Sequence, residues 1–102
     1  MYSAKEYAEM HRKFLEDANP EMLKQLRQSG NLNSYLFSVG EEAEERLASL
    51  MHQYNNSPEV QKLPHQERVR ALQNRQMEAD ELVRDELINQ PLPSSEDEET
   101  QS

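Results

Sequence analysis

The sequence predicts an all-α fold, a compact bundle of about four helices followed by a disordered acidic tail. Only two of its 102 residues are glycine, and Glu, Gln, Arg, Leu and Ala, which lose little rotamer freedom in a helix, are abundant. Apolar residues recur with the helical period in several segments, and helix-capping residues precede them. We assign residues 1–90 to one helical domain and residues 91–102 to the tail.

The first helix is expected to begin after Ser3. Its hydroxyl can accept a hydrogen bond from the backbone amide three residues on while Glu6 reaches back to the amide of Ser3, which is a capping box. The apolar stripe of this helix comprises Tyr7, Met10, Phe14 and Leu15.

A second, short helix is predicted from Asn19 to Gly30. Asn19 suits the N-cap and Pro20 the first helical position, where no amide donor is missed. The apolar residues of this helix are Met22, Leu23 and Leu26. Gly30 can take the left-handed conformation that ends a helix. Residues 31–37 fit either an extended connector or a helical turn, with their apolar side chains filling the core.

A third helix is predicted after Ser38, because Ser38 and Glu41 have the spacing of a second capping box. Its apolar residues repeat with the helical period: Ala43, Leu47, Leu50, Met51 and Tyr54. Pro58 stops this helix, and one helical turn is expected at 58–62.

The fourth and longest helix is predicted at about residues 65–89. One face carries Val69, Leu72, Ala79, Val83 and Leu87, and Gln76 interrupts this apolar stripe. We expect the third and fourth helices to pair antiparallel. From Pro91 onward the chain has almost nothing to bury, so a disordered tail is expected.

Acidic residues dominate the composition. The chain has 20 acidic and 11 basic residues and a formal net charge of −9. Without the four acids at 96–99, 16 acidic and 11 basic residues remain, a net charge of −5. There is no cysteine, which excludes disulfides and thiolate metal sites. No run approaches the ~20 apolar residues that a membrane span needs, and the first residues lack a leader pattern. A cytoplasmic protein without membrane contact is expected.

Several short segments, taken in order along the chain, resemble segments of a known protein family. They are Phe14–Leu15 through Pro20, Leu23, Leu26, Ser29–Leu32, Leu36, Glu42–Leu47, Ala79–Val83 and Glu86–Ile88. Over residues 10–89 the chain resembles the transposon-encoded TnpV family of small helical proteins. The resemblance implies an origin on a mobile genetic element, in a bacterium. The chain departs from the family at residues 4–7, where a more basic lead-in is expected, and in its acidic tail, and both departures weaken the case for a direct grip on transposon DNA.

The residue types that carry catalysis or metal binding are present but not grouped. His11, His52 and His65 fall in different predicted elements, and none pairs with another metal ligand at a helical interval. There is no glycine-rich phosphate loop, and the Ser-x-x-Glu patterns are explained as helix caps. We therefore expect no catalytic residue, no cofactor and no metal, and a protein that is not an enzyme.

The acidic residues predict a binding surface. If the third and fourth helices are antiparallel, the start of one lies beside the end of the other and one pole gathers the negative charge. The residues expected to carry the contact are Glu41, Glu42, Glu44, Glu45, Glu81, Asp85 and Glu86. The predicted partner is a basic surface of a nucleic-acid-handling protein, a nuclease or transposase, bound by mimicry of DNA in the manner of an anti-CRISPR inhibitor. The plainer interpretation is a solvated surface that keeps the chain soluble.

A first alternative is a transposition accessory protein that contacts DNA directly. Arg68, Arg70 and Arg75 place positive charge on the first half of the fourth helix, where a phosphate backbone could be met. It ranks second, because three arginines in a chain of net charge −9 make a weak electrostatic footprint.

A second alternative is a self-associating module. Leu63, Leu82 and Ile88 are expected to lie outside the contact between the two long helices, where they could form a homodimer.

Overall fold

The computed structural model describes residues 2–89 and confirms the all-α class. Its elements are α1 (Ala4–Ala18), α2 (Pro20–Ser29), α3 (Leu32–Asn55), the single turn α4 (Pro58–Gln61), α5 (His65–Val83) and a π-helical turn, η1 (Arg84–Ile88). Residues 2–89 contain no strand. The predicted tail at 91–102 lies outside the described residues. None of the described helices has the length and apolar character to cross a membrane.

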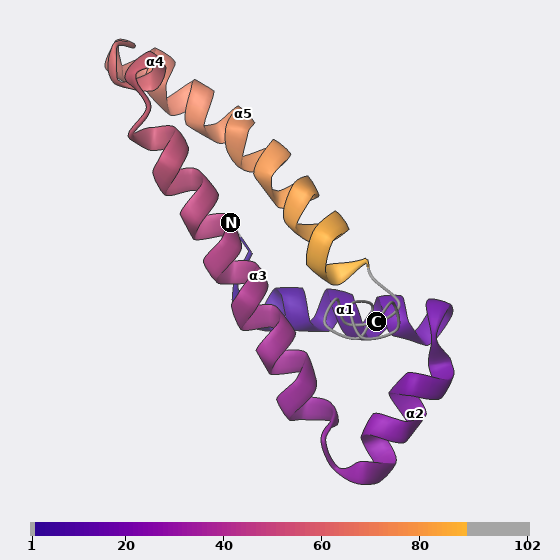
Figure 1. The fold of residues 1–102 in the computed structure, drawn as a ribbon. Helices are drawn as coiled ribbons and strands as arrows, with labels where there is room; N and C mark the ends of the chain where they lie inside the picture. Colours follow the sequence, from indigo (N-terminus) through magenta and orange to yellow (C-terminus); the bar gives the residue numbers. More distant parts are fainter. Residues whose placement is uncertain (1, 90–102) are drawn as a thin grey trace, which may run out of the picture.

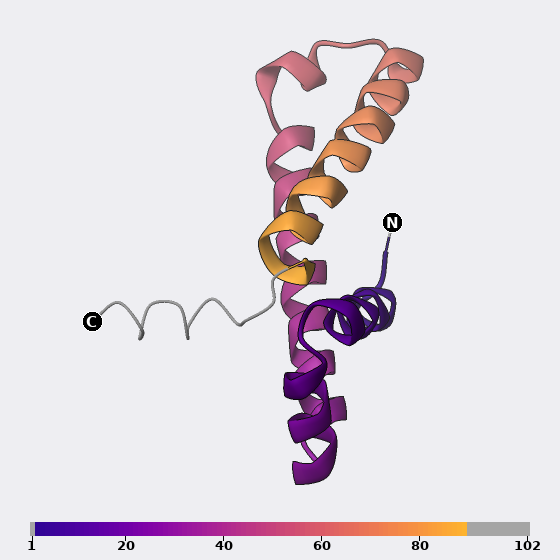
Figure 2. The same ribbon diagram turned by 90° about the vertical axis from the view of Figure 1, so that its right-hand side faces the viewer.

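Helix α3 is the central element of the molecule (Figure 1). Helix α1 crosses it near its middle, and α2 folds back toward its N-terminal end (Figures 1 and 2). Helix α5 runs antiparallel along the C-terminal half of α3, which confirms the predicted pairing of the two long helices (Figures 1 and 2). The pair formed by α2 and the N-terminal end of α3 and the pair formed by α5 and the C-terminal half of α3 extend in opposite directions from the α1 crossing. The molecule is therefore elongated, with extents of 53 × 30 × 20 Å.

The predicted caps of the first two helices are confirmed. The Ser3 hydroxyl accepts a hydrogen bond from the Glu6 amide (3.3 Å), and the Glu6 carboxylate accepts one from the Ser3 amide (2.9 Å). The Asn19 side chain accepts from the Met22 amide at 3.3 Å, and Pro20 is the first residue of α2. Gly30 ends α2 with φ +80°. These signals act over three or four residues, so the local sequence determines them.

The predicted start of the third helix is wrong. Ser38 does not cap it, because α3 begins at Leu32 and already runs through Ser38. Asn31 occupies the N-cap without a side-chain hydrogen bond. Burial of Leu36 and Gly40 continues the stripe of Ala43 and Leu47 toward the N-terminus, so packing extends the helix without a cap. Of the residues expected to fill the core at 31–37, Leu36 is buried but Phe37 remains exposed.

Gly40 marks the point where α1 and α3 meet most closely. A Cβ atom on Gly40 would lie 2.1 Å from the carbonyl oxygen of Ala4 and 3.2 Å from the Ala8 Cβ. Only a residue without a side chain allows this contact. The crossing brings Tyr7 into one buried cluster with α3, α5 and η1, which comprises Tyr7, Ala43, Leu47, Ala79, Val83 and Ile88.

The predicted start of the fourth helix at residue 65 is confirmed, but two of its residues differ from their predicted burial. Val69 was placed on the buried face but is 41 % exposed, because α5 reaches past α1 to a tip where only α3 and α4 support it. Ile88 was expected to be exposed, yet it is buried. The Asn89 amide donates to the Arg84 carbonyl at 2.7 Å, closing a π turn. A π turn holds more residues than an α turn, so Ile88 rotates away from its α-helical position and into the core.

Candidate functional site

Two buried polar contacts tie α1 to the C-terminal part of α5 and to η1. In the first, the Tyr7 hydroxyl donates a hydrogen bond to Asp80 Oδ1 at 2.7 Å. Asp80 Oδ2 lies 3.0 Å from Arg84 Nε, so its second oxygen faces a guanidinium. Burial is the main cause that raises the pKa of Tyr7 well above its usual value, and the bond to Asp80 adds to the rise. Tyr7 therefore remains a neutral donor, and the contact fixes α5 against α1.

In the second contact, His11 is 1 % exposed and uses both ring nitrogens. Nδ1 lies 2.7 Å from the carbonyl oxygen of Ile88, to which it donates, and Nε2 lies 2.9 Å from the Tyr35 hydroxyl, which donates to it. A neutral imidazole satisfies both bonds at once. Burial lowers the pKa of His11, and the bond to the Ile88 carbonyl only partly offsets this. His11 thus links η1, α1 and α3.

This environment predicts a loss of stability in mild acid. Because the pKa of His11 is lowered in the fold, the unfolded chain takes up a proton below about pH 6.5 that folded His11 refuses. The stabilisation is complete above that pH, and it falls by up to ~1.4 kcal/mol per pH unit as the pH drops through the window below it. Urea unfolding at pH 7.5 and 5.5 measures the slope.

His52 supplies the control for this prediction, because it is exposed and its ring lies within hydrogen-bond distance of the Asn56 side chain. His11→Gln should flatten the pH slope between 7.5 and 5.5 more than His52→Gln does. Equal slopes for wild type and His11→Gln would show that His11 is not the group responsible.

One ion pair links the predicted acidic residues of the two long helices. We call Glu41, Glu42, Glu44, Glu45, Glu81, Asp85 and Glu86 the acidic belt. Arg46 Nε lies 3.4 Å from Glu86 Oε1, which joins the α3 part of the belt to the η1 part. Ala43, inside the α3 part, packs in the same cluster as Val83 and Ile88. All belt residues are exposed except Glu44, which is half-buried.

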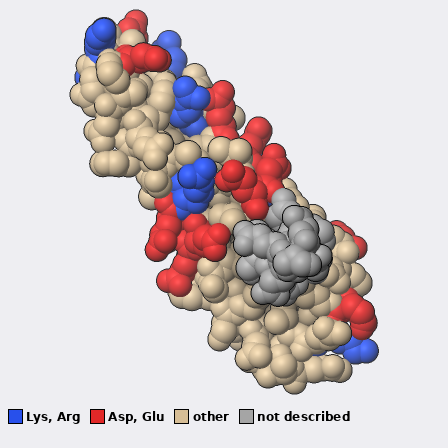
Figure 3. Space-filling view, viewed as in Figure 1, with Lys and Arg blue, Asp and Glu red and all other residues tan. Residues whose placement is uncertain are grey.

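The acidic belt lies midway along the long axis of the molecule (Figure 3), and the prediction that it gathers at one end is wrong. Acidic side chains gather midway along the long axis (Figure 3). The prediction placed the α3 acids at a helix start, where the macrodipole would stabilise them. Since α3 begins at Leu32, residues 41–45 occupy its third and fourth turns, beyond the reach of that effect.

The three arginines of the alternative interpretation lie toward the tip of the α3–α5 hairpin but do not share one face. At 100° per residue, Arg70 is turned about 140–160° from the other two. The Arg68 guanidinium donates to the Gln61 carbonyl at 2.9 Å, which holds the turn before α5. Arg75 lies 4.3 Å above the Tyr54 ring and 3.2 Å from Glu78. Arg68 and Arg75 are thus engaged within the fold.

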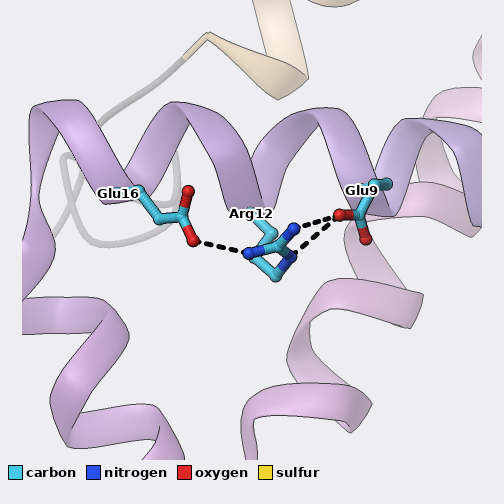
Figure 4. Close-up of polar contacts among 3 residues, drawn as sticks. All are labelled: Glu9, Arg12 and Glu16. Carbon is cyan, nitrogen blue, oxygen red and sulfur yellow. Dashed lines mark hydrogen bonds and ion pairs between the residues drawn. The ribbon is translucent and has the colours of Figure 1, made fainter.

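Acidic residues on α1 are balanced where they stand. Arg12 forms ion pairs with Glu9 and with Glu16, one turn away on either side (Figure 4). These pairs lie on the exposed face of α1. Their charge is largely compensated locally, so α1 contributes less field than the belt does.

A search of residues 2–89 for metal ligands finds no group of three or more His, Cys, Asp or Glu placed to hold an ion. A surface hollow of about 450 Å³ lies between α5 and the start of the chain and is lined in part by Tyr2, Met77 and Arg84. The carboxylate beside it, Asp80, is already bonded to Tyr7.

The polar contacts of Tyr7, His11 and Asp80 were missed from sequence. His11 was considered only as a metal ligand. A signal was present, because Tyr7, His11 and Leu15 are spaced by four and all three are buried on one side of α1. The spacing places His11 in the core, but its partners Tyr35 and Ile88 are distant in sequence.

Fold and surface together define a small all-helical protein with two buried polar contacts and an acidic belt. The chain belongs to the family of the transposon-encoded protein TnpV, whose model matches residues 2–88. The resemblance found from the sequence is confirmed, and the match also covers residues 4–7, where a more basic lead-in was expected. No curated protein and no solved structure matched the chain.

Proposed function

We propose that this member of the TnpV family is a non-enzymatic interaction protein that binds a basic surface of a nucleic-acid-handling protein, a transposase or nuclease. The observation that carries the proposal is the acidic belt, which unites carboxylates from α3, α5 and η1 on packed helices. The Arg46–Glu86 ion pair and the buried cluster around Ala43 support their relative positions.

Rigid helices favour this use of the belt. Carboxylates on two packed helices keep a constant spacing, as phosphates along a nucleic acid do, and complementary potentials speed encounter and select register. Mimicry of DNA, as in an anti-CRISPR-type inhibitor, is the form of binding that we propose. The side chains with burial-shifted pKa values, Tyr7 and His11, face the interior and are used by internal bonds, which supports a structural role for them.

The test neutralises the belt and compares it with an equal change elsewhere. The belt variant carries Glu41→Gln, Glu45→Gln, Glu81→Gln and Asp85→Asn. The matched control carries Glu21→Gln, Glu59→Gln, Glu67→Gln and Asp17→Asn, all exposed. Both variants change the net charge by the same amount and leave the ion pairs of Arg12 and Arg46 intact.

Each protein is immobilised and offered the purified transposase of the mobile element that carries it, or a nuclease of the host. Wild type and the control variant should retain the partner as the salt is raised from about 0.05 to about 0.15 M. Over the same range the affinity of the belt variant for the partner should fall by about tenfold or more. Excess duplex DNA should displace the partner, because both would occupy one basic groove. Equal retention by the belt and control variants would contradict the proposal.

The same experiment separates the alternative, direct DNA contact through Arg68, Arg70 and Arg75. Under that alternative the wild-type chain alone binds duplex DNA, and changing the three arginines to glutamate abolishes the binding. Under the proposal the arginine variant keeps the protein partner.

A further inference from the structure

One side of the α3–α5 hairpin is hollowed and partly apolar. A groove of about 330 Å³ runs between the two helices, and all the residues that line it come from α3 or α5. They are Leu50, Gln53, Tyr54, Arg75, Glu78, Ala79 and Leu82. Leu82, at the edge of the groove, is 43 % exposed. The groove therefore combines apolar residues, among them Leu50 and Leu82, with the charged side chains of Arg75 and Glu78.

A regular stripe of residues follows this edge of α5. Its members are separated alternately by three and four positions, so they lie along one side of the helix: Arg68, Ala71, Arg75, Glu78, Leu82 and Asp85. In order they are basic, small, basic, acidic, apolar and acidic. Reversing the order exchanges each base for an acid and the small residue for the large one. The stripe is thus complementary to itself when two copies run in opposite directions.

We propose that this stripe is a homodimer interface, in which the α5 helices of two copies lie antiparallel about a two-fold axis between Arg75 and Glu78. Arg75 then faces the partner's Glu78, and Ala71 leaves room for the partner's Leu82. At the ends of the stripe Arg68, which keeps its bond to the Gln61 carbonyl, lies opposite the partner's Asp85. An isologous contact of this kind repeats every pair twice.

The arrangement of Arg75 favours this pairing. Its guanidinium is already held over the Tyr54 ring at 4.3 Å and beside Glu78 at 3.2 Å, so less side-chain freedom is lost on association. A parallel pair would bring Arg75 onto the partner's Arg75, and like charges oppose that register. The charge order selects a second copy of this chain as the occupant, since each copy carries the matching pattern.

The test exchanges charges between copies. In the Arg75→Glu variant, the acid at position 75 faces the partner's Glu78, so two acids meet. In the Glu78→Arg variant, Arg75 faces the base at the partner's position 78, so two bases meet. Each variant alone should dimerise about tenfold or more weakly than wild type, because two symmetry-related attractions become repulsions. In an equimolar mixture both contacts between unlike copies join an acid to a base, so a heterodimer of about wild-type strength should form.

Sedimentation velocity over a concentration series, with one variant fluorescently labelled, measures these species. The mixture excludes an effect confined to one chain, because the contact between positions 75 and 78 inside each variant stays repulsive. Both side chains are at least 48 % exposed, so the helical content seen by circular dichroism should persist.

Two further variants locate the face. Leu82→Asp should abolish dimerisation, and Met77→Asp, on another side of α5 and 70 % exposed, should preserve it. A wild type that stays monomeric at every concentration, a mixture that does not recover the dimer, or loss of the dimer in Met77→Asp alone would each overturn the proposal. Arg75, Glu78 and Leu82 lie outside the acidic belt, and Asp85 is the one residue that both surfaces share. Repeating the belt experiment with Asp85 unchanged therefore separates the two proposals.

Discussion

Replacing Gly40 with alanine should destabilise the fold by about 2 kcal/mol or more, as overpacking at a close contact does. Within a helix the substitution would ordinarily stabilise by roughly 1 kcal/mol, because alanine loses less backbone entropy than glycine. Here the new Cβ would lie 2.1 Å from the Ala4 carbonyl oxygen. That oxygen belongs to the backbone of α1 and cannot rotate away, so α1 must move and the cluster around Tyr7 must loosen.

Urea unfolding monitored by circular dichroism measures this effect, and Ser38→Ala is the matched control. Ser38 is exposed, two residues earlier in the same helix. As a residue inside α3 it should become neutral or slightly more stable on change to alanine, whereas an N-cap serine would lose about 1 kcal/mol. The pair of variants thus tests both the crossing and the true start of α3. An increase in stability for Gly40→Ala would contradict the close approach of α1.

Replacing Asp80 with alanine is the second large effect, an expected loss of about 1.5–3 kcal/mol, the range for hydrogen bonds to charged groups. The change leaves the Tyr7 hydroxyl without its 2.7 Å acceptor inside the core and removes the carboxylate 3.0 Å from Arg84. A buried hydroxyl without a partner has lost its hydrogen bonds to water and gains none in the protein, so its desolvation destabilises the fold.

A double-mutant cycle with Tyr7→Phe isolates the contact. If the hydroxyl and carboxylate act on each other, the two losses should fall short of additivity by about 1–2 kcal/mol. The control is Glu81→Ala, an exposed neighbour whose change should stay within about 0.5 kcal/mol. Additive losses would show that Tyr7 and Asp80 contribute separately.

The early part of the fold could be predicted because its signals are short. Ser3 with Glu6, Asn19 with Pro20, and the left-handed Gly30 each act within a few residues, and each is confirmed. The same kind of signal misled at Ser38, where a capping pattern occurs inside a helix that packing extends to Leu32. A cap pattern shows where a helix can begin, and buried contacts decide where it does begin.

The candidate sites divide in the same way. The acidic residues of the belt were identified from charge alone, and antiparallel pairing of the long helices placed them together. Their position midway along the molecule depended on the true start of α3. The self-complementary stripe on α5 is visible in the sequence only after the structure shows which edge of the helix is open.

The amino-acid sequence by itself determined the all-helical class, the first caps, the membership in the TnpV family and the excess of negative charge, because each depends on composition or on residues close together in the chain. The tertiary structure alone decided that α1 crosses α3 at Gly40, that His11 bonds to Tyr35 and Ile88, and that a π turn buries Ile88. Those contacts join residues up to 77 positions apart, and their geometry arises only when the helices pack.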